Sequence, residues 1–366
     1  MVAKDSPTAD SRGLSDYKEK IRTSASRPVL SHLNADTSWL LSLAYPPIST
    51  PPPGRSRYNI VIDPWFTGAQ SDVAKWFSTQ YHAVKSDIQS IAALNQIIAE
   101  AEATLLPETH KANSEPPLSY IDAVVISHEF TDHCHRATLL ELPRSTPIYS
   151  TSKAVDIIKS WNHFTTVINI PSLSKTTDWR TTAIAPLPSW LGISRLITEG
   201  NSLYYHSAVI ICIPNTQEDA PDRAENAAEA IIYTPHGVEH GTFSIFSKAK
   251  PPISTLALLH GLHDVSITLT KQLNLGAHNA FKAQKLLKPK YWVGTHDEVK
   301  KGLGLIGPLL RRKVWTLEDA MEKARKEDRR KSLSDGPIVK EKVEEVEQEE
   351  QVPYVTCGNG ETLVLA

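Results

Sequence analysis

"VVISHEFTDHCHRATLL", residues 124–140, passes abruptly from an apolar run into a crowd of polar side chains. Within eight residues it carries three histidines and two carboxylates: His128, Glu129, Asp132, His133 and His135. The β-branched residues at its start predict a short strand, and the polar residues then lie in the loop that follows. A rigid strand can aim side chains from such a loop at one point. A nitrogen and oxygen set of this kind suits Zn²⁺ and also accepts Fe or Mn.

The composition bounds the kind of protein that surrounds this stretch. The chain has 366 residues, of which 40% are hydrophobic, enough for one large domain or two smaller ones. Its 39 Lys and Arg nearly balance 41 Asp and Glu, so nucleic acid is not an expected partner. Three distant cysteines do not make a disulfide framework. With a polar N-terminus and no apolar run long enough for a membrane span, we expect a cytoplasmic protein.

Apolar periodicity outlines the elements around the histidine-rich loop. Strands expected at 38–45 and 58–66 form a hairpin around a proline-rich connection. Helical spacing predicts helices at 87–106 and 279–287. Further strands are expected at 120–127, 147–151, 165–170, 181–187, 202–213, 229–235, 255–261 and 290–296. The strands fall in two runs with helices interspersed, which predicts two sheets packed face to face with helices outside.

The ends of the chain differ from this central part. Residues 1–27 are polar and are predicted to be disordered, which leaves 28–320 as the main domain. Residues 321–351 are basic in their first half and acidic in their second, typical of a solvated helix or a disordered insertion. Residues 352–366 return to apolar alternation around a Gly-Asn-Gly turn. We expect them to form a terminal strand pair that completes the domain.

The loop resembles the metal-binding motif of metallo-β-lactamase-fold hydrolases, which carry His-x-His-x-Asp-His at the end of a strand. His128, Asp132 and His133 match this motif, and Phe130 stands where its second histidine should be. The combination of "DPWFTGAQSDVAKWFS" (63–78), "ISHEFTDHCH", "YTPHG" (233–237) and "GTHDE" (294–298) looks most like uncharacterised fungal members. The nearest branch holds lactonase-like and phospholipase D-like hydrolases. The resemblance implies an α/β fold: a four-layer αββα sandwich of two mixed sheets flanked by helices.

The resemblance also implies a set of ligands. Asp132, His133 and His296 match the family's second metal site, and His236 stands where an Asp bridges two ions. The stretch 185–195, where a third histidine of the first site is expected, contains none. The hypothesis is therefore a single ion held by Asp132, His133, His236 and His296, most simply Zn²⁺, with Fe or Mn as alternatives. His128 is a fifth ligand, a base or a hydrogen-bond partner of bound water.

Other residues are candidates for the surroundings of the ion. Asp63, at the end of the second hairpin strand, can orient a ligating histidine. Trp65, Phe130 and Trp190 are expected to shape an apolar pocket wall. Three histidines are weaker candidates. His206 is more simply a core histidine, and His260 and His263 follow a strand that can reach the pocket.

These residues predict a metal-dependent hydrolase of a small molecule. Water activated by the ion would attack an ester, lactone, lactam, thioester or phosphoester, with Asp132 and His128 as the catalytic residues. The alternative is a pseudoenzyme that kept the sandwich and acts as a binding or scaffold protein, which the incomplete motif favours. A metal-dependent oxidoreductase is a third hypothesis, because some relatives use iron. The sequence leaves the oligomeric state open.

Overall fold

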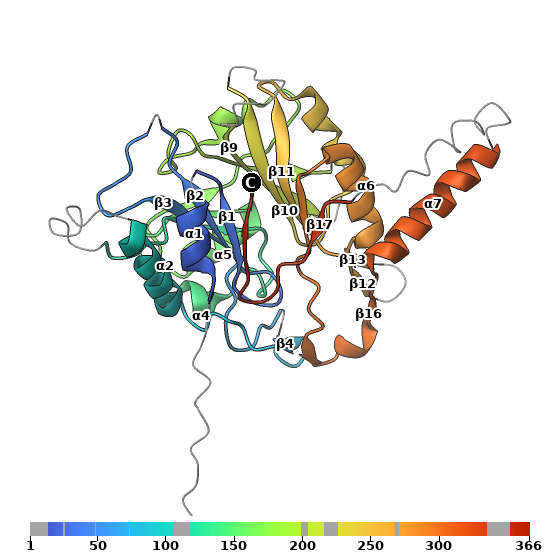
Figure 1. Ribbon diagram of the computed structural model, residues 1–366. Coiled ribbons are helices and arrows are strands. Elements are labelled where there is room, and N and C mark those ends of the chain that lie inside the picture. The colour runs from blue at the N-terminus through green and yellow to red at the C-terminus, as the bar shows by residue number, and fades with distance from the viewer. Residues whose placement is uncertain are drawn as a thin grey trace, which may run out of the picture.

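Two β-sheets lie face to face in the computed structural model, with helices on their outer sides (Figure 1). The structure describes residues 14–366 except 25, 48, 73, 106–116, 199–203, 216–225, 268–270 and 335–351. The first sheet has the order β18-β1-β2-β3-β5-β6-β7. Its strands are β1 (Val29–His32), β2 (Trp39–Ala44), β3 (Arg57–Ile62), β5 (Ala123–Ile126), β6 (Ile148–Ser150), β7 (Val167–Asn169) and β18 (Thr362–Val364).

The second sheet has the order β17-β14-β11-β10-β9-β8. Its strands are β8 (Gly192–Ile197), β9 (Ser207–Pro214), β10 (Ala228–Thr234), β11 (Ile253–His260), β14 (Tyr291–Val293) and β17 (Tyr354–Val355). Both sheets are mixed: β3, β5, β6 and β7 run parallel in the first, and β10, β11, β14 and β17 in the second. This pairing matches the αββα sandwich that the sequence predicts.

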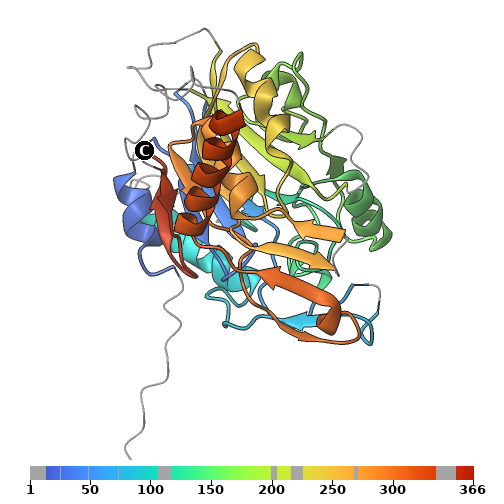
Figure 2. The same ribbon diagram turned by 90° about the vertical axis from the view of Figure 1, so that its right-hand side faces the viewer.

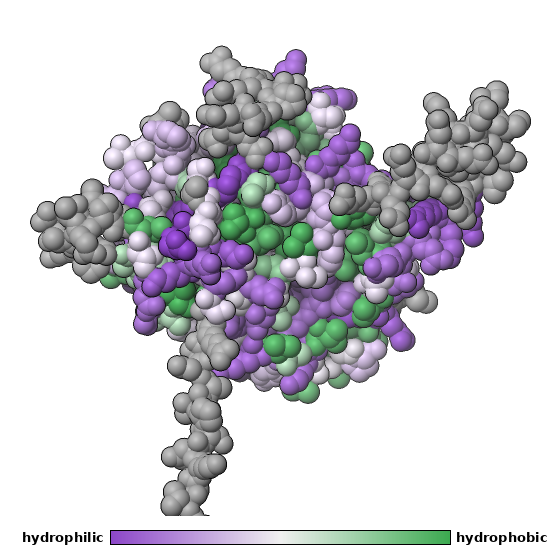
Figure 3. All heavy atoms as spheres, in the orientation of Figure 1, coloured by the Kyte–Doolittle hydropathy of each residue, from purple (hydrophilic) through white to green (hydrophobic). Residues whose placement is uncertain are grey.

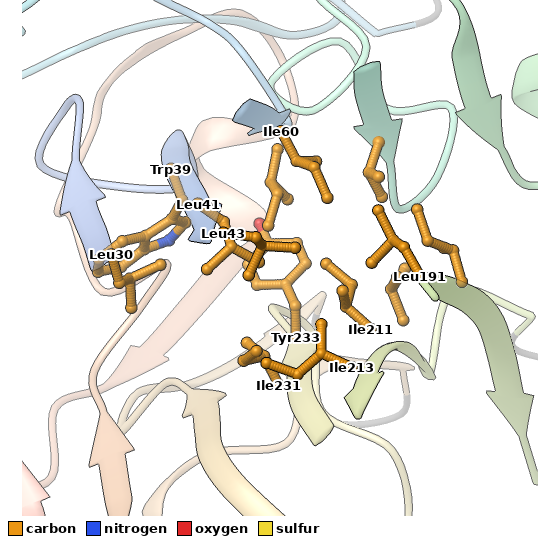
Figure 4. Packing of buried hydrophobic residues seen from close by; sticks show 14 of the residues in the cluster. Leu30, Trp39, Leu41, Leu43, Ile60, Leu191, Ile211, Ile213, Ile231 and Tyr233 are labelled. Carbon is orange, nitrogen blue, oxygen red and sulfur yellow. The ribbon is translucent and has the colours of Figure 1, made fainter. Parts of the chain in front are cut away.

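The core lies between the sheets because alternate strand residues point in opposite directions. Leu41 and Ile60 face inward and meet Ile211 and Tyr233 of the second sheet, whereas Leu40 faces the outer helices (Figure 4). Most strand residues are buried on both faces, which explains their nearly continuous apolar sequences.

Helices cover both outer faces. The first sheet carries α1 (Tyr17–Thr23), α2 (Ile91–Leu105), α4 (Arg136–Leu139) and α5 (Ser152–Ser160). The second sheet carries α6 (Ala277–Leu287), α7 (Leu317–Ser334) and the 3-10 helix η2 (His240–Lys248) (Figure 2). No helix of the described ranges is both long and apolar enough to span a bilayer.

Two small sheets extend from the edge of the sandwich at which the candidate site lies. One contains β12 (Asp264–Ile267), β13 (Lys271–Asn274) and β16 (Leu310–Lys313). The other pairs β4 (Thr79–Tyr81) with β15 (Lys301–Leu303), which the 3-10 helix η3 (Gly307–Leu309) follows. Figure 2 shows the two small sheets near each other at the bottom of the molecule.

Three expectations from the sequence need correction. Within the segment 1–27 predicted to be disordered, residues 17–23 form α1, because Tyr17 and Ile21 lie one helical turn apart and are both buried. The strand expected at 181–187 is wrong: the 3-10 helix η1 (Trp179–Thr182) and a loop occupy that region. The terminal strands do not pair with each other, since β17 joins β14 and β18 joins β1. Of the charged segment 321–351, residues up to 334 continue α7, and 335–351 lie outside the described residues.

Candidate metal centre

The ends of parallel strands bring the proposed ligands together. His128 follows β5, and Asp132 and His133 lie in the turn after it. His236 follows β10 and His296 follows β14. The carboxyl ends of β10 and β14 lie at one edge of the second sheet, and the packing of the two sheets sets the end of β5 beside them. Such edges commonly hold ligands. All five side chains are buried, and they form two overlapping groups of potential metal ligands centred on His133.

Distances within this cluster are in the range of metal ligands. The Nε2 atoms of His133 and His236 are 3.2 Å apart, and Nε2 of His133 is 3.6 Å from Oδ1 of Asp132. Nε2 of His296 lies 3.9 Å from Oδ2 of Asp132. A tetrahedral Zn²⁺ with bonds of about 2.0–2.1 Å separates its ligand atoms by about 3.3 Å. Asp132, His133 and His296 therefore form one group of potential ligands, and His236 belongs with His128 to a second group that shares His133.

Outer partners fix the orientation of three of these histidines. Nδ1 of His133 donates to Oδ2 of Asp63 at 2.6 Å, and Nδ1 of His296 donates to Oδ1 of Asp36 at 3.0 Å. Nδ1 of His236 donates to Oδ1 of Asn274 at 2.8 Å. An acceptor at Nδ1 assigns the proton to that nitrogen and leaves a lone pair on Nε2. This is the arrangement that metal-binding histidines normally have.

Opposed lone pairs on His133 and His236 require a positive charge between them. Burial and the nearby His296 and His133 hold the pKa of His236 well below its usual range. Burial opposes protonation of His133, but the carboxylates of Asp132 and Asp63 outweigh it and raise its pKa. A proton shared by the two rings or a metal ion can supply the charge. The neutral nitrogens and the carboxylate of Asp132 fit a divalent cation.

His128 differs from the other three histidines. Its Nδ1 accepts the backbone N–H of Phe130 at 3.3 Å, which assigns the ring proton to Nε2. That Nε2 is buried and has no hydrogen-bond partner among the described residues. Burial and the neighbouring His133 and His236 hold the pKa of His128 well below its usual range. Towards the cluster, His128 therefore presents an N–H donor rather than a lone pair. The ring centres of His128 and His133 are 3.8 Å apart.

Lys300 is a site residue that the sequence did not reveal. Its Nζ lies 2.6 Å from Oδ2 of Asp132 and 2.7 Å from Oδ2 of Asp36, with little of its side chain exposed. The only local signal is its position four residues after His296. Lys300 pairs with Asp36 and Asp132, and a third buried carboxylate, Asp63, pairs with His133. With the histidines neutral, these three carboxylates and the ammonium group leave a formal charge of −2, which equals the charge that one divalent ion neutralises.

Two residues of the cluster adopt left-handed backbone conformations. His296 has φ +60° and Asp63 has φ +44°. Such angles cost a non-glycine residue about 1 kcal/mol or more and concentrate at functional sites. Each conformation is held by contacts across the sandwich: His296 N–H donates to Asp36 O at 2.9 Å, and Asp63 N–H to Val125 O at 3.0 Å. The strain places both side chains where the cluster needs them.

A cavity of about 360 Å³ opens onto the cluster. Asp132, His236, His296 and Lys300 line it where it reaches the cluster. Apolar side chains form much of its wall: Phe77, Phe130, Tyr205, Val265, Ile267, Leu273, Ile306 and Leu310. A largely apolar cavity with a few convergent polar groups is the usual form of a small-molecule site.

Several candidates from the sequence lie elsewhere. Trp190 packs between the sheets, with its ring centre 5.7 Å from that of Tyr45, so its assignment to the pocket wall is wrong. Trp65 is fully buried and stacks on His82 at 3.7 Å behind the cluster. Phe130 does line the cavity, 4.9 Å from the ring of His128.

The weaker histidine candidates bind backbone or other side chains. Nε2 of His206 is 3.0 Å from Leu273 O, and Nδ1 of His260 is 2.8 Å from Gly261 O. Nδ1 of His263 lies 3.0 Å from Nη1 of Arg312, a residue of the cavity wall. These contacts hold the neighbouring loops and do not bring the three histidines into the ligand cluster.

Asp72, in the cavity wall, carries an unfavourable charge. Burial and the nearby Asp132 raise its pKa to about 6. This pKa is higher in the folded protein than in the unfolded chain. The folded protein is therefore destabilised as the pH rises from the unfolded pKa to the folded pKa of Asp72. We expect Asp72→Asn to stabilise the metal-free protein by roughly 1–3 kcal/mol at pH 8, with the gain vanishing towards pH 4. Urea unfolding at several pH values measures this, and a gain independent of pH would contradict the assignment.

No family model and no curated protein matches the sequence. Solved structures do match. A "possible metal-dependent hydrolase" from Veillonella parvula is 12% identical with a TM-score of 0.50, over 92% of this chain and 99% of that one. An isothiocyanate hydrolase from Delia radicum gut bacteria is 15% identical with a TM-score of 0.45, over 92% and 98%.

The metallo-β-lactamase fold protein YhfI from Bacillus subtilis also matches, at 10% identity and a TM-score of 0.37, over 82% of this chain and 93% of that one. Identities this low concern the fold and leave the activity open. Two mixed sheets face to face with helices outside, and ligand candidates at one edge, are the architecture that the sequence motif implied. The chain has the metallo-β-lactamase fold.

Proposed function

We propose that the protein is a metal-dependent hydrolase that holds one divalent ion with Asp132, His133, His236 and His296. The observation that supports this proposal is a buried cluster in which Asp132 and His296 lie within ligand distance of His133 and Nε2 of His236 lies 3.2 Å from Nε2 of His133. The formal charge of −2 on the buried cluster supports one ion rather than two, because a second would leave a buried excess of positive charge. Zn²⁺ is the simplest choice for such a set, with Fe or Mn as alternatives.

When bound, the ion supplies Lewis-acid chemistry, which polarises a carbonyl or phosphoryl oxygen and lowers the pKa of water. His128 does not line the cavity, and its buried Nε2–H group is proposed to donate a hydrogen bond to water held within the cluster. Lys300 holds Oδ2 of Asp132, which leaves Oδ1 for the ion. Phe130 fills the place of a further ligand with an apolar ring against the cavity.

The volume and lining of the cavity indicate the size and polarity of the substrate. They do not specify which bond is broken. Its volume of about 360 Å³ suits a small molecule, and its apolar wall favours an apolar body next to the hydrolysed group. An ester, lactone, lactam, thioester or phosphoester places a polarisable oxygen at the ion. The proposal does not distinguish among them.

Metal content tests the proposal directly. We expect the purified protein to carry close to one divalent ion per chain, and His133→Ala and His296→Ala to lose it, because each removes a ligand nitrogen. His240→Ala, which removes a histidine with a partly exposed side chain outside the cluster, is the matched control and should keep the ion. Elemental analysis measures the ratio. No ion in the parent protein after loading with Zn²⁺, Fe²⁺ and Mn²⁺ would overturn the proposal, and two tightly bound ions would overturn the single-ion site.

One observation favours the second candidate, a pseudoenzyme that binds a ligand or partner. The Lys300 ammonium lies 2.6 Å from a ligand carboxylate and can compete with a cation for it. Turnover separates the two candidates. Hydrolysis of a panel of esters, lactones, lactams, thioesters and phosphodiesters that is lost in His133→Ala supports the enzyme. An ion retained without any turnover supports the pseudoenzyme.

A further inference from the structure

Exposed apolar side chains gather on the face formed by β4, β15 and η3. Twelve large hydrophobic residues are exposed among the described residues, and eight of them fall in the segments 76–84 and 299–314. Four lie next to one another in these segments and define what we call the apolar rim: Trp76 (67% exposed), Leu303 (63%), Leu305 (65%) and Leu309 (47%). Figure 3 shows apolar patches at the lower edge of the molecule, where Figure 1 places β4.

Backbone pairing holds the two segments of the rim side by side. β15 runs antiparallel to β4, with Leu303 opposite Thr79. Beyond the strands, Leu305 N–H donates to Trp76 O at 3.3 Å. Large apolar groups exposed together in this way mark an interaction surface, whereas single exposed ones are ordinary.

Basic residues predominate in the two segments of the rim. Residues 74–85 contain Lys75 and Lys85 and no acidic residue, and residues 299–315 contain five basic residues and no acidic one. Lys300 is buried at the metal centre, whereas Lys75, Lys85, Lys301, Arg311 and Lys313 are exposed. The adjacent Glu298 is buried and pairs with His82 at 2.7 Å. The face therefore combines protruding Trp and Leu side chains with exposed cations, although Lys313 lies near Asp319 and the carboxylates of Asp72 and Asp87 flank the first segment.

We propose that this face binds the surface of membranes that contain anionic lipids. Trp and Leu side chains enter the boundary between headgroups and acyl chains, and Lys and Arg are attracted to anionic headgroups. A symmetric dimer through the same face would place its cations against one another, which disfavours a second copy of the chain. Leucine side chains offer nothing to a phosphate backbone, which disfavours nucleic acid.

The cavity lies beside this face. Phe77 and Gln80 of the first segment and Ile306 and Leu310 of the second line its wall. A membrane bound at the apolar rim would thus lie near the cavity. The proposal concerns binding alone and does not depend on hydrolase activity.

Vesicle co-sedimentation of the full chain tests the proposal. We expect binding to phosphatidylcholine vesicles that contain phosphatidylserine, weaker binding to phosphatidylcholine alone, and loss of binding as salt rises. The triple variant Trp76→Ser/Leu303→Ser/Leu305→Ser should lose about tenfold or more in binding. Lys301→Glu/Arg311→Glu should lose about fivefold or more for each residue on the anionic vesicles alone.

A matched triple variant controls for the loss of exposed apolar area elsewhere. Leu118→Ser/Ile157→Ser/Leu286→Ser changes residues that are 82%, 40% and 51% exposed and lie outside the rim, and it should bind as the parent does. His133→Ala should also bind vesicles normally, so failure of the metal proposal is distinguishable from failure of this one. Thermal unfolding checks that every variant folds.

Several results would overturn the proposal. One is the absence of vesicle binding by the parent, and another is binding that persists in the apolar-rim variant. A concentration-dependent dimer that disappears in that variant would assign the face to self-association. Binding to polyglutamate without binding to vesicles would assign it to an acidic protein partner.

Discussion

Lys300→Met is expected to destabilise the metal-free protein and at the same time to raise its affinity for a divalent ion. The substitution leaves Asp36 and Asp132 buried without their ammonium partner, and breaking a buried ion pair in this way costs about 3–5 kcal/mol. It also removes the cation that competes for Oδ2 of Asp132, so the cluster attracts a metal more strongly. The variant is thus expected to be less stable without metal but to bind metal more tightly. A general loss of structure would lower both the stability and the metal affinity.

The pH dependence of this loss has a definite direction. Although burial opposes it, Lys300 holds the pKa of Asp132 well below its usual range, so the stabilisation is present above the unfolded pKa and is lost as the pH falls. The deficit of Lys300→Met, measured by urea unfolding with a chelator present, should therefore be largest near pH 7 and shrink in acid. The double variant Lys300→Met/Asp36→Asn should recover about half of it. A deficit that is independent of pH, together with unchanged metal affinity, would contradict the role given to Lys300.

Asp63→Asn is expected to weaken metal binding by about 10–100-fold, because the carboxylate orients a ligand without contacting the ion. The carboxylate of Asp63 accepts hydrogen bonds from Nδ1 of His133 at 2.6 Å, from Ser127 N at 2.8 Å and from Ser127 Oγ at 2.5 Å. In the Asn variant an NH2 group replaces one carboxylate oxygen. This group cannot accept a hydrogen bond, so at least one of these contacts is lost. Asn tolerates the left-handed backbone at this position, so the change tests hydrogen bonding rather than backbone strain.

Competition with a chelating dye measures the affinity of this variant, and urea unfolding measures the accompanying loss of stability, about 1–3 kcal/mol. Ser127→Ala is the control, since it removes one donor and leaves the carboxylate against His133. It should change the metal affinity by less than about threefold. Equal affinities in Asp63→Asn and the parent protein would show that Asp63 has no part in orienting the ligand.

Local patterns predicted the parts of the site that lie at strand ends. An apolar, β-branched run before His128, another before His236 and a third before His296 each mark a strand and its end. Parallel pairing with β11 brings the ends before His236 and His296 to one edge of the second sheet, and the face-to-face packing of the two sheets sets the end before His128 beside them. The sandwich itself was predicted for the same reason, since strands in two runs with helices between them have few ways to bury their apolar faces.

Contacts between distant segments were not predictable in this way. Asp36 and Lys300 meet across the sandwich, and no periodicity in either segment specifies the other. Trp190 shows the converse error, because an aromatic residue in a proline-containing loop has the same local sequence whether it faces a cavity or a core. The helix α1 was missed because the polar composition of its segment concealed two apolar residues one helical turn apart.

The pairing of β1 with β18 has a consequence for biosynthesis. Residues 29–32 emerge early from the ribosome, but their outer neighbour in the sheet, residues 362–364, is made more than three hundred residues later. Until then one edge of β1 presents unpaired N–H and C=O groups, which are a template for strand addition by other chains. Domains rich in such distant pairings also fold slowly. The nascent chain must therefore keep this edge covered throughout translation, and a ribosome that stalls before residue 362 releases a product whose first sheet remains open.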